Sequence, residues 1–245
     1  MNKLTPILDF IFPPRCIVTG DIVDQQGMIS PQAWAELNFI SDPKCTRCGI
    51  PFGFLEDDHY TNTQSSCVMC LKYPPIYKNA RSVFLYDDAS RHMVLGFKHG
   101  DQTQNAPAFA VWLERAGQDI LPHIDYIIPV PLHPFRLMKR RFNQSGLLAQ
   151  ALSKKTDIPV LLEGLKRIRS TPVQGYLQRE ERKKNVRKAF KVNKRYKPLI
   201  KNRNIVLIDD VFTTGATINE CTRELLKNEA GSVSVLTLAR VVKPV

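Results

Sequence analysis

The sequence predicts an α/β fold, with a mostly parallel sheet, that follows a small cysteine-rich module. Its clearest strand is Ile205–Ile208, where consecutive aliphatic residues are typical of a strand buried on both faces. An amphipathic helix comes soon after it, because apolar residues recur at helical spacing from Ile218 to Leu225. By contrast, residues 1–75 hold five of the six cysteines, many turn residues and little apolar periodicity. The chain is therefore expected to divide into a module at 1–75 and a domain at 76–245.

The N-terminal module is expected to bind zinc. Its cysteines include two Cys-x₂-Cys pairs with 18 residues between them, a spacing that is typical of a four-thiolate zinc ribbon. A closed site of this kind is structural, and it supplies folding free energy that so small a module lacks. Free or redox-active thiols are the alternative. The expected zinc ligands are Cys45, Cys48, Cys67 and Cys70.

The second part is expected to begin after Pro74-Pro75, where the composition changes. Its strands alternate with helices, which is typical of α/β domains. The expected strands are Ala80–Tyr86, Asp125–Pro131, Ile205–Ile208 and Ser232–Ala239. The expected helices cover residues 106–117, which include a core Trp112, then about 145–155, and from about Thr217 to a stop at Gly231.

Two adjacent carboxylates, Asp209 and Asp210, stand at the carboxyl end of the Ile205–Ile208 strand, where open α/β sheets bind ligands. A turn of small and hydroxyl residues leads from them to the next helix. The free N–H groups of that helix suit a phosphate, whereas the carboxylates suit ribose hydroxyls, with Mg²⁺ bridging to further phosphates. The residues therefore predict a ribose 5-phosphate site. The turn consists of Thr213, Thr214, Gly215, Ala216 and Thr217.

The segment Ile208–Thr217 closely resembles the phosphoribosyl pyrophosphate (PRPP) loop of type I phosphoribosyltransferases. The resemblance implies that Asp209 and Asp210 hold the ribose hydroxyls and that the 213–217 turn holds the 5′-phosphate. It also implies a pyrophosphate site after the Asp125–Pro131 strand, closed by a mobile basic loop, since arginine side chains suit a highly charged leaving group. A surface strand–turn–helix without a ligand is the alternative. The basic residues concerned are Arg136, Lys139, Arg140 and Arg141.

Nearly the whole chain resembles proteins of the ComF family (ComFC type), from Phe12–Cys16 to the final strand. The resemblance implies a zinc ribbon on a domain of phosphoribosyltransferase type. It also implies a role in natural competence, where imported single-stranded DNA is handled in the cytoplasm. The matching segments include Leu95–Gly100, Arg140–Gln144, Arg167–Gln174 and Arg179–Phe190.

The chain departs from the ComF pattern in two places. ComF proteins often carry a second zinc site, with cysteine pairs where this chain has Cys16/Thr19 and Ser30/Ala33. Three of those four ligands are missing, so the second site is expected to be degenerate and Cys16 to be a buried or free thiol. In addition, Arg141 replaces a glycine, and if that glycine serves a turn with φ > 0 the pyrophosphate loop is altered.

The positive charge of the chain is concentrated in one segment. Residues 136–203 hold 21 Lys and Arg against 4 Asp and Glu, within a chain of formal net charge +12. So one-sided an excess predicts an anionic ligand or partner. Interleaved aromatic residues suit the stacking of single-stranded bases, although they could equally anchor a basic loop to the core. The candidate DNA contacts are Arg179, Arg182, Lys183, Lys184, Arg187, Phe142 and Tyr176.

Two function classes stay open. The first is a competence-type protein that binds PRPP and single-stranded DNA in DNA uptake, with phosphoribosyl transfer undecided and a competence helicase or recombination protein as a candidate partner. The alternative is an active phosphoribosyltransferase of nucleotide or base metabolism that uses PRPP and Mg²⁺ without a nucleic-acid role. Nothing in the sequence identifies the base that would accept the phosphoribosyl group. No apolar run has the length of a membrane span, and Leu4–Phe12 is broken by Pro6 and Asp9, so a cytoplasmic protein is expected.

Overall fold

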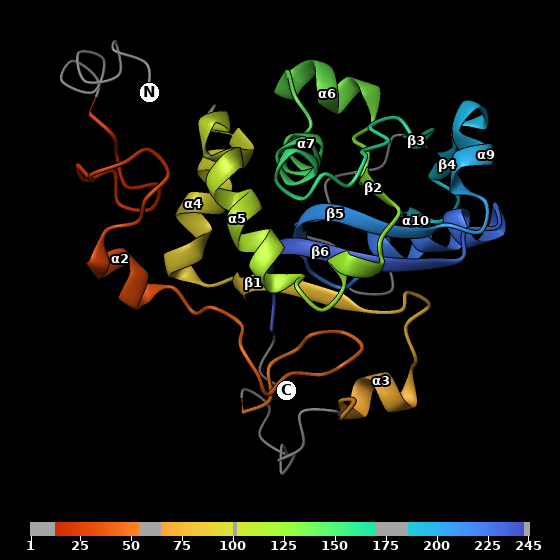
Figure 1. The fold of residues 1–245 in the computed structure, drawn as a ribbon, viewed down its shortest axis with the longest axis horizontal. Coiled ribbons are helices and arrows are strands. Elements are labelled where there is room, and N and C mark those ends of the chain that lie inside the picture. Colours follow the sequence, from red (N-terminus) through yellow and green to blue (C-terminus); the bar gives the residue numbers. More distant parts are fainter. Residues whose placement is uncertain (1–12, 54–64, 100–101, 170–185, 243–245) are drawn as a thin grey trace.

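The centre of the fold is a four-stranded parallel sheet in the order β1-β6-β5-β2 (Figure 1). The structure is a computed structural model that describes residues 13–53, 65–99, 102–169 and 186–242. Its sheet consists of β1 (Ala80–Leu85), β2 (Tyr126–Pro129), β5 (Asn204–Phe212) and β6 (Ser232–Arg240). A separate antiparallel pair consists of β3 (Leu165–Arg167) and β4 (Phe190–Val192). The predicted α/β class with a mostly parallel sheet is confirmed.

Helices cover both faces of this sheet. The helices are α2 (Pro31–Glu36), α3 (Val68–Lys72), α4 (Asp88–His99), α5 (Ala106–Ala116), α6 (Pro134–Arg140), α7 (Gln144–Thr156), α9 (Lys197–Ile200) and α10 (Ala216–Lys227). α4, α5 and α7 pack together on one face, and α10 packs on the other with β3 and β4 (Figure 1). α5 and α7 match the helices predicted for residues 106–117 and 145–155 to within a residue.

The aliphatic run of β5 is continuous because both of its faces are buried. Ile205 and Leu207 belong to the core on the α10 face, whereas Val206 and Ile208 belong to the core under α5 and α7. Successive side chains of a strand point to opposite faces, so each core takes alternate residues. β5 is thereby held in the middle of the sheet, and its carboxyl end is positioned by packing on both sides.

Three local predictions differ from the structure. β5 continues beyond Ile208 to Phe212, so the acidic pair lies within the strand and not after it. The basic run after β2 forms the helix α6, since Pro134 is well suited to a first helical position. α10 ends at Lys227, four residues before Gly231, and the chain turns at Glu229, which has φ 65°.

Arg141 occupies the position where ComF proteins have a glycine. It follows α6 with φ 65° and ψ −23°, in the left-handed region that glycine adopts at low cost. The turn is therefore made in this chain by an arginine, and its side chain is exposed.

The N-terminal module packs along β1. The ring of Phe39 lies 4.6 Å from that of Trp34 and 5.9 Å from that of Trp112, between centroids. Ile17 and Leu37 belong to the same core as α5 and α7. Because the two parts share this core, the division at residue 75 stays a prediction.

Three other expectations concern burial and membranes. Cys221 and Cys16 are both buried, and Trp112 packs against the core, as predicted. Within the ranges that the structure describes, no helix is long and apolar enough to cross a membrane.

Candidate functional site

The acidic pair of β5 is fixed by contacts from several elements. Ser145 Oγ, at the start of α7, donates to Asp209 Oδ1 (3.0 Å), which also accepts from Asp210 N (3.0 Å). Val211 N donates to Asp210 Oδ1 (2.7 Å). Lys98 of α4 forms an ion pair with Asp210, with 2.7 Å between Nζ and Oδ2. The two carboxylates are therefore held side by side at this end of the sheet.

The environment of Asp209 disfavours its charged form. Burial raises the pKa of Asp209 to about 7, and the neighbouring charge of Asp210 adds to the shift. The positive charge of Lys98 and the hydrogen bonds from Asp210 N and Ser145 Oγ act in the opposite direction. A cation that approached Asp209 would therefore compete with a proton at neutral pH.

We expect Asp209→Asn to stabilise the ligand-free protein more at about pH 8 than at about pH 5. Folded Asp209 keeps its proton up to about pH 7, whereas the unfolded chain releases it near 3.8, so stability falls as pH rises between these values. The asparagine removes that loss, which we place on the order of 1 to 2 kcal/mol because the carboxyl is only half-buried. Urea unfolding without Mg²⁺ at both pH values measures it. Equal effects at the two pH values would contradict the prediction.

The turn after β5 has features that suit an anion. Gly215 precedes α10 with φ 71°, and the Phe212 ring lies 2.9 Å from where a Cβ would sit, so the position requires glycine. Having no side chain, Gly215 cannot cap the N–H groups of α10. Thr214 Oγ1 is buried and has no hydrogen-bond partner in the described part of the chain. A buried orphan hydroxyl beside an uncapped helix start suits a phosphate.

The remaining predicted contact residues fall into three groups. Arg136, Lys139 and Arg140 lie on α6, with Arg141 directly after it, and their role toward pyrophosphate stays a prediction. Phe142 is half-buried, and Arg187 is exposed. The other candidate DNA contacts lie outside the described residues, namely Tyr176, Arg179, Arg182, Lys183 and Lys184.

Two residues of the site carry no signal of their own in the sequence. Lys98 lies in a segment that resembles ComF proteins, but nothing in that segment indicates an ion pair with Asp210. Ser145 precedes Asp209 by 64 positions, and it reaches the carboxylate only because α7 packs on β5. Both residues come from helices on the same face of the sheet.

A cavity of about 710 Å³ lies beside the end of β2, among α6, α7 and β3. Its described lining is mostly apolar and includes Leu137, Phe142, Leu147, Leu162, Leu165 and Ile168. Neither the acidic pair nor the 213–217 turn is among those described lining residues, so the cavity is separate from the predicted ribose-phosphate site.

The four predicted zinc ligands converge in the N-terminal module. Their Sγ atoms all lie within 4.8 Å of one another, and all four side chains are buried. The N–H groups of Cys48 and Cys67 donate to Cys45 Sγ at 3.4 and 3.2 Å, which is an arrangement that stabilises thiolates. Four converging sulfurs fit a closed tetrahedral zinc site, whose role would be structural.

A second knuckle in the module has the same backbone pattern. Thr19 N and Ser30 N donate to Cys16 Sγ at 3.5 and 3.2 Å, as in the four-cysteine site. Burial opposes ionisation of Cys16, yet these hydrogen bonds outweigh it and lower the pKa of the thiol to about 7. Ala33 takes the place of a fourth ligand. The knuckle therefore keeps its backbone hydrogen bonds to sulfur, but only one of the four ligand positions holds a cysteine.

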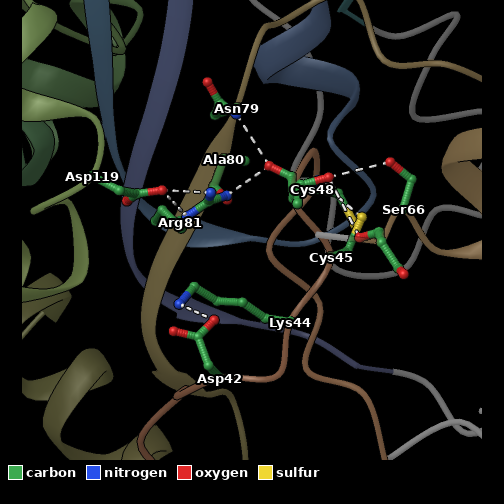
Figure 2. A network of polar contacts seen from close by, with 11 residues as sticks. Asp42, Lys44, Cys45, Cys48, Ser66, Asn79, Ala80, Arg81 and Asp119 are labelled. Atoms are coloured by element: carbon green, nitrogen blue, oxygen red, sulfur yellow. Dashed lines mark hydrogen bonds and ion pairs between the residues drawn. The ribbon is translucent and has the colours of Figure 1, made fainter. Parts of the chain in front are cut away.

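Two buried arginines join the four-cysteine knuckle to the sheet. Arg81 of β1 donates to Asp119 Oδ2 through Nε (3.1 Å) and Nη2 (2.6 Å), and to Thr46 O through Nη1 (3.0 Å) (Figure 2). Arg240 of β6 donates to Cys48 O, and its guanidinium lies 4.7 Å over the Phe212 ring. The Phe212 ring in turn packs against Gly215, so the knuckle is connected to the 213–217 turn.

Comparison with known proteins places this arrangement in a family. A family model described as a double zinc ribbon domain matches residues 7–72. "Competence protein F" of Haemophilus influenzae is 34% identical over 207 residues, which cover 82% of this chain and 86% of that protein. The chain belongs to the ComF family. "DNA utilization protein YhgH" of Escherichia coli K12 is 32% identical over 205 residues, covering 81% and 84% of the two chains.

More distant relatives extend the comparison. "Competence protein ComFC" of Bacillus subtilis is 28% identical over 169 residues, covering 67% of this ComF chain and 65% of its own. Two solved structures align in part. An allosteric regulatory enzyme of purine biosynthesis has 18% identity and a TM-score of 0.40, covering 59% of this chain and 30% of its own. Trypanosoma cruzi hypoxanthine phosphoribosyltransferase has 14% identity and a TM-score of 0.35, covering 56% and 65%. Scores this low carry no argument about function.

Proposed function

We propose that this ComF protein binds PRPP with Mg²⁺ at the carboxyl end of β5 and binds single-stranded DNA through its basic segment. The observation that carries the PRPP half is the unsatisfied Thr214 hydroxyl between an acidic pair and an uncapped helix start. This set of groups matches a ribose phosphate, because hydroxyls suit the carboxylates and an anion suits the helix end. The protein would act in the cytoplasm, on DNA that has been taken up.

Mg²⁺ suits this site together with PRPP because carboxylate oxygens are its preferred protein ligands. Asp209 and Asp210 would hold it, and the bound metal would neutralise phosphate charge. Lys98 already supplies a positive charge at Asp210. Asp209 must lose its proton before it can serve as a ligand.

The DNA half of the proposal rests on charge. The exposed side chains of the basic segment include Lys166, Arg169, Arg187, Lys188 and Lys191. The names of the relatives, competence protein and DNA utilization protein, support the same assignment. Contacts between lysine or arginine side chains and phosphates release counterions, and binding by this mode depends steeply on salt.

Titration of a fluorescent oligothymidylate at several salt concentrations tests the DNA half. We expect log Kd to rise linearly with log salt, with a slope of roughly 3 to 6, as several phosphate contacts would give. A duplex of the same length serves as the comparison for strand preference. Affinity that does not change with salt, or no binding at moderate salt, would contradict nucleic-acid binding.

An active phosphoribosyltransferase without a nucleic-acid role is the second candidate, because the acidic pair and the phosphate turn are both intact. It predicts release of pyrophosphate from PRPP in the presence of a free base and no effect of single-stranded DNA. Release that requires single-stranded DNA would favour the first proposal.

A further inference from the structure

The surface of α6 is unusual for a short helix because large apolar side chains face outward. Phe135 is 70% exposed and Met138 is 77% exposed. The Phe135 ring stacks on that of His133, with centroids 5.4 Å apart and planes at 30°. The Phe135 ring is therefore held by His133 and is exposed to solvent. Leu137 of the same helix lines the 710 Å³ cavity.

Basic residues are interspersed with these apolar ones in the sequence of α6. Residues 135–141 read Phe-Arg-Leu-Met-Lys-Arg-Arg. Near the cavity, Lys166 and Arg169 are exposed, and Glu163 is the single acidic residue of the described lining. A groove for an amphipathic peptide helix would present a continuous apolar stripe. Exposed apolar groups next to cationic residues suit a partner that repeats a planar apolar group and an anion in every unit, which is a single strand of nucleic acid.

We propose that α6 and the adjacent cavity form a base-docking site for single-stranded DNA, in which Phe135 stacks on one base and the cavity receives another. This inference deepens the DNA half of the proposed function and rests on it. Stacking on a ring that is already held by His133 lowers the ordering cost of binding. The cavity has the size and apolar lining of pockets that take small planar ligands.

The site is placed so that it can be occupied together with the ribose-phosphate site. Asn143 and Gly146 of the α7 start line the cavity, while Ser145 between them donates to Asp209. The first turn of α7 therefore forms a wall common to both sites, with one ligand on each side. The described linings share no residue beyond that turn.

The test compares two oligonucleotides of equal length and charge, an oligothymidylate and its abasic counterpart. Fluorescence anisotropy gives the affinity of native protein, Phe135→Leu and Phe135→Trp, with Tyr73→Leu as the matched control at an exposed aromatic residue of the zinc module. We expect Phe135→Leu to weaken oligothymidylate binding about 5- to 100-fold and to leave the abasic oligomer unchanged. Phe135→Trp should preserve both affinities, and Tyr73→Leu should change neither.

Each other outcome has a separate meaning. Oligothymidylate binding unaffected by Phe135→Leu would overturn base docking at α6 while leaving DNA binding in place. Equal losses on both oligomers would show a contact with phosphate and not with a base. A Phe135→Leu variant that changes the sedimentation of the protein alone would instead assign the surface to a second copy of this chain. No binding by the native protein would refute the DNA half of the proposed function itself, whereas calorimetry with PRPP tests the other half separately.

Discussion

The double variant Asp209→Asn/Asp210→Asn is expected to lose Mg²⁺-dependent PRPP binding, with an affinity at least about 100-fold lower than that of the native protein. Both substitutions keep the shape of the side chains and the acceptors for Ser145 and the backbone. They remove the negative charge that would hold the ribose hydroxyls and the metal. They also leave Lys98 without its partner at Asp210. Isothermal titration calorimetry with PRPP and Mg²⁺ measures the loss.

Asp157→Asn is the matched control, because Asp157 is exposed at the end of α7 and asparagine tolerates its φ of 57°. Its PRPP affinity should equal that of the native protein. If the double variant bound PRPP as tightly as the native protein, the acidic pair would not be the ribose site. If the native protein did not bind PRPP at all, the β5–α10 motif would be a retained scaffold, and the basic segment would carry the function.

Cys45→Ser and Cys70→Ser are each expected to remove zinc from the protein and to unfold the N-terminal module. The native chain should contain about one zinc ion, since its four converging sulfurs form one closed site. Zinc binding at such sites supplies on the order of 10 kcal/mol, which is comparable to the whole stability of a typical domain. Elemental analysis of purified protein gives the zinc content, and circular dichroism with proteolysis reports the state of the module.

Cys16→Ser is the control for this loss. Cys16 lies in the degenerate knuckle, so its variant should keep the zinc content and the stability of the native protein to within about 1 kcal/mol. Two zinc ions per native chain would contradict the assignment of the Cys16 knuckle as degenerate. An unchanged zinc content in Cys70→Ser would contradict the four-cysteine site.

The parts of the fold that could be predicted are those whose signal is local. β5 and α10 follow from a run of aliphatic residues and from helical spacing, both within about 20 positions. The β3–β4 pair could not be found in this way. Each of its strands has three residues, and their pairing joins segments that are apart in sequence. α6 could not be predicted from amphipathic spacing, because none of its side chains whose burial is described is buried.

The candidate site also combines residues that a local motif identifies with residues that only the tertiary fold brings together. Asp209, Asp210 and the 213–217 turn lie in one short segment, so a motif could identify them. Lys98 and Ser145 reach the pair from α4 and α7, and only the packing of the helices on the sheet brings them there. The raised pKa of Asp209 likewise depends on burial, which the spacing of residues does not report.

The contacts of Arg240 have a consequence for the order in which the molecule forms. Arg240 and its acceptor Cys48 are 192 positions apart, and the Ser82–Thr237 hydrogen bond (2.7 Å) between β1 and β6 joins residues 155 apart. During synthesis the four cysteines leave the ribosome long before β6. The ribbon can therefore fold around zinc first. At that stage β1 still lacks β6, which is its only neighbour in the described four-stranded sheet. The closing of the sheet is in this sense the last step, and the arrival of β6 adds the Arg240 contact to those that already join the zinc ribbon to β1.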